Sequence, residues 1–126
     1  MTKIEIKRVY DDPAGMPAED GFRVYADRLW PRGESKERFH YDLWAKDVAP
    51  STELREWLRE WFHADPDGRW DAFRRRYLAE LAANPAAVKL AETLKGRPLV
   101  TLLYSSRDGE HNNEVVLAEY LRQKIS

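Results

Sequence analysis

An unbroken apolar run near the C-terminus, "PLVTLLYS" (residues 98–105), most constrains how this chain can fold. Its β-branched members favour a strand, and it lacks the apolar–polar alternation of a strand with one face in water. A strand of this kind lies in the middle of a sheet that is covered on both faces. The run therefore predicts a sheet flanked by helices, with this segment as a central strand.

Two further strands are expected in the first part of the chain. Residues 3–9, "KIEIKRV", alternate at period two, with the isoleucines and the valine on the buried side. A second strand is expected over about residues 22–27, after a loop rich in proline, glycine and aspartate. Residues 38–48, "RFHYDLWAKDV", alternate only in part, which indicates an extended segment or a short strand followed by a turn.

Helical signals fill the middle and the end of the chain. Ser51 is a suitable N-cap for a first helix, which carries one apolar stripe rich in tryptophan. Two more helices are expected from Pro66 and Pro85, because proline suits the first helical position. A last helix is expected from about Asn113. The order β-β-(β)-α-α-α-β-α predicts one α/β domain over residues 1–126, three-layer-like, with a small, mainly parallel sheet flanked by helices.

The composition excludes several kinds of function. The chain has no cysteine, which rules out disulfides, thiolate nucleophiles and cysteine-bound zinc. Its net charge is −1, so nucleic acid is not the expected partner and any anion binding must come from a local cluster. The N-terminus lacks the apolar region of a signal peptide, and no segment approaches the roughly 18 apolar residues of a membrane span. We therefore expect a cytoplasmic protein without membrane contact.

A local cluster of cationic residues follows the second predicted strand, in "ADRLWPRGESK" (residues 26–36). Arg28, Arg32 and Lys36 recur there, with Trp30 among them. In α/β proteins, ligands usually sit beyond the carboxyl ends of the strands. Arginine presents a planar fork that matches phosphate or carboxylate. We expect these cations to hold a phosphate- or carboxylate-bearing small molecule, with Trp30 as a stacking wall.

A second loop, "SSRDGEHNN" (residues 105–113), follows the buried strand and leads into the last helix. If the two strands are parallel neighbours, both loops open on the same edge of the sheet. Ser105 and Arg107 would then face the first loop. The free N–H groups near Asn112 and Asn113, at the helix N-terminus, would complete a cradle for the anion. Alternatively, the same charges could only brace the loops through ion pairs.

The chemistry of this predicted site stays open. Asp108 and His111 are the candidates for a general acid or base if a reaction takes place there. Lys46, in "WAKDV", is expected at the rim as a further cation or proton carrier. The histidines lack metal-ligand spacing and nucleotide-binding glycine motifs are missing, so neither a metal nor a cofactor is expected.

Two other functions stay open as alternatives. The arginines of "GRWDAFRRRYLAEL" (residues 68–81) could suit a helix-turn-helix that binds nucleic acid. Aromatic residues separate those arginines, however, and acidic residues offset their charge. The tryptophan-rich stripe of the preceding helix could instead form a face for a protein partner. The sequence leaves the oligomeric state open.

Several segments together resemble the YeaO-like branch of domain-of-unknown-function family 488. They are "RVYDDP", "DGFRVYADRLWPRGESKE", "DLWAKDVAPSTELREW", "WDAFRRRYLAEL" and "VTLLYSSRDGEHNNEVVLAEYL". The resemblance covers nearly the whole chain and implies a small bacterial cytoplasmic α/β protein, but it supplies no activity. Asp27, Arg28 and Pro31 look like the wider family's Asp-x-Arg…Pro element. At that family's Cys-His-Arg loop this chain keeps a histidine but has no cysteine, which puts any thiol chemistry in doubt here.

Overall fold

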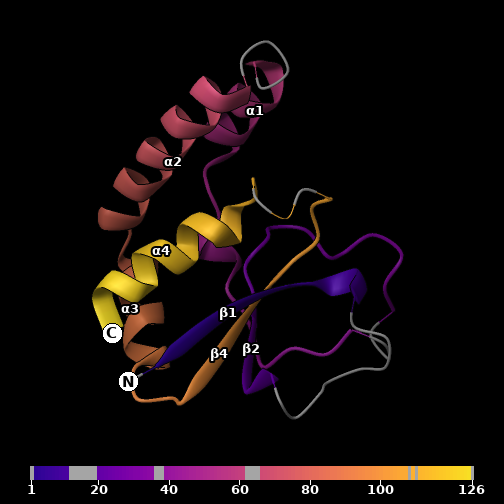
Figure 1. Ribbon diagram of the computed structural model, residues 1–126, viewed down its shortest axis with the longest axis vertical. Coiled ribbons are helices and arrows are strands. Elements are labelled where there is room, and N and C mark those ends of the chain that lie inside the picture. Colours follow the sequence, from indigo (N-terminus) through magenta and orange to yellow (C-terminus); the bar gives the residue numbers. More distant parts are fainter. Residues whose placement is uncertain are drawn as a thin grey trace.

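The apolar run forms β4 (Leu99–Tyr104), which lies inside a four-stranded sheet (Figure 1). The computed structural model describes residues 2–11, 20–35, 39–61, 66–107, 109 and 111–125. The sheet order is β1-β4-β2-β3, and the other strands are β1 (Lys3–Arg8), β2 (Phe22–Tyr25) and β3 (Leu43–Trp44). Every pairing is parallel. The expected small parallel sheet with a buried central strand is therefore confirmed.

Four helices begin close to their predicted signals. They are α1 (Thr52–Trp61), α2 (Pro66–Ala82), α3 (Pro85–Leu94) and α4 (Asn113–Ile125). The Ser51 hydroxyl accepts a hydrogen bond from the Leu54 amide at 3.1 Å, and the Asn84 side chain accepts one from the Ala86 amide at 2.9 Å. These bonds satisfy amide groups that have no partner inside the helix. In the described part of the chain, no helix is long and apolar enough to cross a bilayer.

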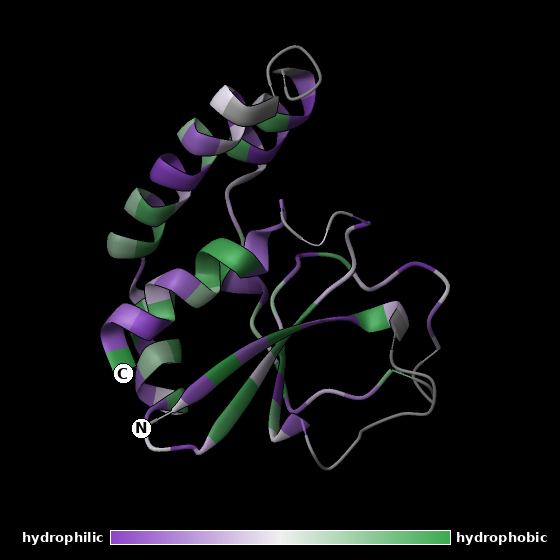
Figure 2. Ribbon diagram, viewed as in Figure 1, coloured by the Kyte–Doolittle hydropathy of each residue, from purple (hydrophilic) through white to green (hydrophobic). Residues whose placement is uncertain are grey.

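The two faces of the sheet are covered differently. Helices cover one face, where α4 packs against β1 and β4, and α1 and α2 form a hairpin that extends beyond the sheet (Figure 1). Figure 2 shows hydrophobic colour along much of β4, with hydrophobic and hydrophilic bands in turn along α2. Aromatic residues cover the second face, mostly from the segment between β2 and the end of β3: Tyr25, Trp30, Phe39, Tyr41 and Trp44. The α/β fold is as expected, and this third layer consists of side chains from β2, β3 and the segment between them.

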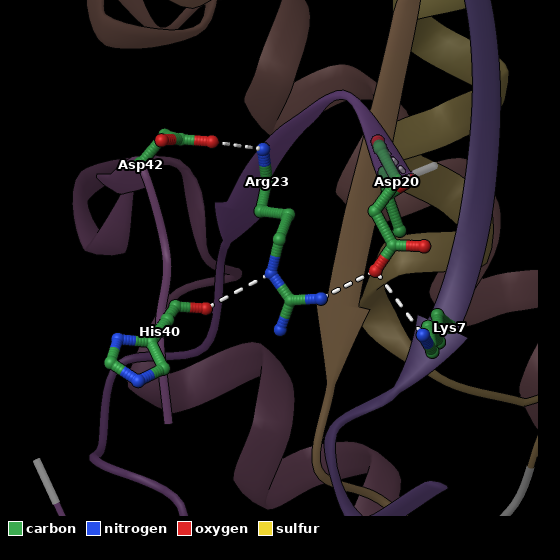
Figure 3. Close-up of polar contacts among 6 residues, drawn as sticks. Lys7, Asp20, Arg23, His40 and Asp42 are labelled. Carbon is green, nitrogen blue, oxygen red and sulfur yellow. Dashed lines mark hydrogen bonds and ion pairs between the residues drawn. The ribbon is translucent and has the colours of Figure 1, made fainter. Parts of the chain in front are cut away.

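A buried ionic network holds the start of β2 in place (Figure 3). Arg23 is 0% exposed and pairs with Asp20, which also binds the Lys7 ammonium at 3.2 Å. The Arg23 Nε donates to the carbonyl of His40 at 3.0 Å, and its backbone amide donates to Asp42 at 2.8 Å. A buried guanidinium is tolerated because its donors are satisfied in this way. The network links β1, β2 and the segment before β3.

Candidate functional site

The loops that follow β2 and β4 meet at one edge of the sheet. The two strands are parallel neighbours, with Tyr25 in register with Leu103. Just beyond them, the amide and the hydroxyl of Ser105 both donate to one carboxylate oxygen of Asp27, at 3.2 and 2.8 Å. The sequence made the meeting of the loops conditional on parallel neighbouring strands, and the structure meets that condition.

A cavity of about 360 Å³ opens between these loops. Its lining residues are Tyr10, Asp27, Arg28, Leu29, Trp30, Arg32, Arg55, Ser105 and Ser106. Three of them are arginines, two from the loop after β2 and one from α1. We call this cavity with its lining residues the arginine pocket.

Two larger hollows among the described residues carry charges of both signs. A cavity of about 430 Å³ over β1 contains Lys3 and Lys7 together with Glu5 and Asp20. Another, of about 670 Å³ between α1 and α2, has one arginine and two glutamates in its lining. The arginine pocket is therefore the stronger candidate for an anion site, although it is not the largest hollow.

The three arginines keep donors available to a ligand. Arg28 uses Nε to donate to the Pro50 carbonyl, at 3.3 Å. The Nε of Arg55 is buried and has no hydrogen-bond partner. Arg32 is exposed, and its backbone carbonyl accepts from the Tyr10 hydroxyl at 2.7 Å. Within the described residues, none of the three guanidinium groups forms an ion pair.

Trp30 has a clear structural role. Its indole N–H donates to the Glu34 carbonyl at 2.6 Å. Its ring packs edge-on against Phe39 and Trp44, with centroids 5.1 and 5.8 Å away. Trp30 also lines the arginine pocket, so a stacking role toward a ligand stays a prediction.

Other predicted ligand residues are placed elsewhere or lie outside the described part of the chain. Lys46 is exposed at the start of the short helix η3 (Lys46–Val48), and its ammonium lies 5.1 Å from the ring centroid of Trp44. Arg107 is exposed, and neither cation lines the arginine pocket. Lys36 and Asp108 lie outside the described residues.

The residues at the start of α4 serve that helix and the loop after β2. The Asn112 side chain accepts from the Val115 amide at 3.1 Å and so caps α4. The Asn113 side chain donates to the second carboxylate oxygen of Asp27 at 3.3 Å. His111 packs against the ring of Trp70, with centroids 5.0 Å apart. None of these three predicted residues lines the arginine pocket.

A buried carboxyl group lies beside Asp27. Glu114, in the first turn of α4, is 0% exposed, and neither of its carboxyl oxygens has a hydrogen bond of ordinary geometry. Burial raises the pKa of Glu114 well above its usual range, and the charge and proximity of Asp27 raise it further. Glu114 therefore keeps its proton to a higher pH than an ordinary glutamate.

Two tyrosines complete the surroundings of this carboxyl pair. The Tyr25 hydroxyl donates to the Leu29 carbonyl at 2.6 Å, and the Tyr77 hydroxyl donates to the Val48 carbonyl at 2.7 Å. Burial is the main cause that raises the pKa of both phenols, and the negative charge of the Asp27–Glu114 pair adds to it. Both phenols therefore act as neutral donors around the carboxyl groups.

Sequence reasoning missed Arg55 and Glu114 as site residues and did not place Asp27 at the centre. Helical spacing carried a signal for Glu114, because it lies three and seven positions before the buried Leu117 and Leu121. A glutamate on a buried helical stripe indicates a group that needs a partner. No comparable signal marks Arg55, since arginine is ordinary on an exposed helix.

Comparison with known proteins places the chain in a family. A family model described as "Inactive DUF488-N3 subclade" matches residues 3–126. The chain is 46% identical over 122 residues to the uncharacterized protein YeaO of Escherichia coli (strain K12), covering 94% of this chain and 96% of YeaO. It is 40% identical over 120 residues to the uncharacterized protein Rv3073c of Mycobacterium tuberculosis (strain ATCC 25618 / H37Rv), covering 95% and 94%. No solved structure gives a significant match. The chain therefore belongs to the inactive DUF488-N3 subclade, as a YeaO-like member of family 488.

Proposed function

We propose that the protein binds a phosphate- or carboxylate-bearing small molecule in the arginine pocket. The observation that carries this proposal is the convergence of Arg28, Arg32 and Arg55 on one cavity, without an ion-pair partner among the described residues. The one carboxylate in the lining, Asp27, is already held by Ser105 and Asn113. Guanidinium groups bind oxyanions through paired, charge-assisted hydrogen bonds.

The size of the pocket supports a small ligand. Its volume of about 360 Å³ lies at the lower end of the roughly 300–1,000 Å³ that is typical of small-molecule sites. A phosphorylated metabolite or an organic acid fits this volume better than a large cofactor. Two of the three arginines come from one loop, which suits the enclosure of a compact charged group.

Binding without turnover suits the family assignment. The family is described as inactive, and the loop after β4 lacks the cysteine of the wider family's Cys-His-Arg element. A ligand-binding protein is therefore the function that we propose, with no reaction assigned. A bacterial, cytoplasmic setting is part of the proposal, supported by the bacterial relatives and the cysteine-free composition.

The arginines of α2 do not favour nucleic acid as the alternative ligand. Arg69 and Arg76 lie over the ring of Trp57, at 5.1 and 4.3 Å from its centroid. The remaining arginines form ion pairs, Arg74 with Glu119 and Arg75 with Asp71. These contacts hold the α2 arginines against other side chains of the same chain. The arginines of the arginine pocket, in contrast, have no acidic partner in the described part of the chain.

A thermal-shift screen with calorimetry tests the proposal. The panel contains inorganic phosphate, sugar phosphates, nucleotides, carboxylic acids and short nucleic acids. A ligand should raise the melting temperature of the parent protein through linkage. It should have little effect on an Arg28→Ala/Arg32→Ala variant or on an Arg55→Ala variant. Each lost arginine contact removes about 1.5–3 kcal/mol, or roughly ten- to a hundredfold in affinity.

The matched control is Arg59→Ala, which removes the same charge from an exposed position on the same helix as Arg55. This variant should bind like the parent. Unchanged binding by folded Arg28→Ala/Arg32→Ala and Arg55→Ala variants would refute the arginine pocket as the site. Stabilisation by nucleic acid alone would favour the alternative.

A further inference from the structure

We propose that Asp27 and Glu114 share a proton beneath the arginine pocket, and that oxyanion binding there is coupled to the protonation of this carboxyl pair. The inference rests on the proposed function and adds the chemistry that regulates it. It assigns proton linkage to two residues that lie on different elements, Asp27 after β2 and Glu114 at the start of α4.

Glu114 is the buried member of the pair. Its side chain is fully buried, and its two oxygens lack hydrogen bonds of ordinary geometry. An ionised carboxylate that is fully buried without such hydrogen bonds is costly, so the neutral form is strongly favoured. Glu114 therefore acts as a protonated carboxyl group beside an ionised one.

Asp27 is the hydrogen-bonded member of the pair. Three donors already bind its carboxylate, namely the amide and hydroxyl of Ser105 and the side-chain amide of Asn113. These donors occupy three of the positions at which the carboxylate can accept a hydrogen bond. A carboxylate offers about four acceptor positions, so one remains on the side of Glu114. One proton for two neighbouring carboxyl groups is the arrangement that avoids two adjacent negative charges.

Titratable and charged groups from several elements surround the pair. From β2 comes Tyr25, and from α2 comes Tyr77, both neutral donors. Arg28 is the cation on this side, since its charge lowers the pKa of Tyr77 while Glu114 and Asp27 raise it. One turn before Tyr77, Arg74 is paired with Glu119. His111 precedes α4 and packs against Trp70, so a variant of this residue serves as a control.

Asp27 connects the pair to the ligand site. Asp27 lines the arginine pocket, so its charge acts directly on an anion bound there. With the shared proton in place, the pair carries one negative charge against three guanidinium groups. Loss of the proton adds a second negative charge and weakens anion binding. By reciprocity, anion binding raises the affinity of the pair for its proton.

Inorganic sulfate is the probe that isolates this effect, because its charge is constant across the range of interest, whereas phosphate titrates near neutrality. Affinity is measured by calorimetry from about pH 5 to about pH 9, where arginine stays charged. The parent protein should bind sulfate more weakly as the pH rises. The expected loss is on the order of tenfold, because the added negative charge repels sulfate through a medium whose effective dielectric constant lies between that of water and that of a protein surface.

Variants identify the group responsible. Glu114→Gln keeps the size and neutrality of the protonated side chain but cannot titrate, so its affinity for sulfate should stay flat over the same range. Glu60→Gln, at an exposed position on α1, and His111→Gln should both keep the profile of the parent. The inference is overturned if the affinity of His111→Gln for sulfate does not change with pH. It is also overturned if the affinity of Glu114→Gln falls with pH as that of the parent does.

A measurement on the parent protein covers the case in which Glu114→Gln does not fold. Calorimetry in two buffers of different ionisation enthalpy counts the protons taken up when sulfate binds. Net proton uptake at the pH values where the affinity for sulfate falls supports the pair. Sulfate binding with no proton uptake and a constant affinity overturns the inference and leaves the proposed function standing. No sulfate binding at any pH overturns both.

Discussion

Ser105 and Asp27 join the two loops of the candidate site, through a backbone amide at 3.2 Å and a hydroxyl at 2.8 Å on the same carboxylate oxygen. Asn113 binds the other oxygen at 3.3 Å. The carboxylate is thus held by neutral donors, whereas the arginines around it have no ion-pair partner within the described residues. This division supports the proposal that the cations of the arginine pocket bind an anion.

Asp27→Ala should destabilise the protein, because it leaves the amide of Ser105 and the side chain of Asn113 without their acceptor. Hydrogen bonds to a charged group contribute about 1.5–3 kcal/mol to the free energy of unfolding, so a loss of this size is expected in urea denaturation. Asp71→Ala is the control, since Asp71 lies on α2 in an exposed ion pair. An exposed pair of this kind contributes little. Equal losses in the two variants would contradict a bracing role for Asp27.

Local signals were sufficient for most of the fold. The apolar run of β4, the alternation of Ile4 and Ile6 in β1 and the capping residue Ser51 each act over a few residues, and the structure confirms these three. The placement of Val9 on the same side was wrong, because the strand ends at Arg8 and Val9 begins the short helix η1 (Val9–Asp11), where it packs with the aromatic cluster on the other face. The short strand β3 was ambiguous because only two residues pair. Backbone hydrogen bonds to its neighbour define it, from Asp42 to Arg23 and from Ala45 to Tyr25. No local pattern predicts such contacts.

The candidate site was predictable only in part, because some of its contacts join residues that are far apart in the sequence. The cations after β2 were visible in one stretch of sequence, and Arg28 and Arg32 do line the pocket. Arg55 reaches the pocket only because the chain brings α1 beside that loop. The pairing of Asp27 with Glu114 depends on the packing of α4 against the sheet. Helical periodicity could place Glu114 inside the protein, but it could not name its partner.

Arg23→Ala should be more damaging than the loss of an exposed arginine. The substitution leaves Asp20, which is 8% exposed, without its guanidinium partner and removes the donor to the His40 carbonyl. Breaking a buried pair by removing one partner costs about 3–5 kcal/mol. Arg75→Ala, at an exposed pair on α2, is the matched control. Urea denaturation that gives similar midpoints for both variants would contradict the structural role of the network.

Gly21→Ala should destabilise the protein more than Gly33→Ala, although both glycines have positive φ, 65° and 83°. A Cβ atom at Gly21 would lie 2.4 Å from the carbonyl oxygen of Leu99, whereas one at Gly33 would meet nothing within 4 Å. Gly33→Ala should therefore lower the free energy of unfolding only through strain of the left-handed backbone, by about 1–2 kcal/mol. Gly21→Ala has this cost and must also move β4 or its own loop. Equal shifts in the urea midpoint would show that the approach to Leu99 does not limit the size of residue 21.

Glu114→Gln should change how stability depends on pH. The pKa of Glu114 in the folded protein lies well above its ordinary value near 4.5, which applies to the unfolded chain. The unfolded state therefore releases this proton first as the pH rises. The contribution of Glu114 to stability is complete below the unfolded pKa and is lost progressively up to the folded pKa, at up to about 1.36 kcal/mol per pH unit. Urea denaturation across this window should give a flatter profile for Glu114→Gln, with a relative gain in stability toward alkaline pH. Parallel profiles for the variant and the parent would show that Glu114 is already ionised in the folded protein.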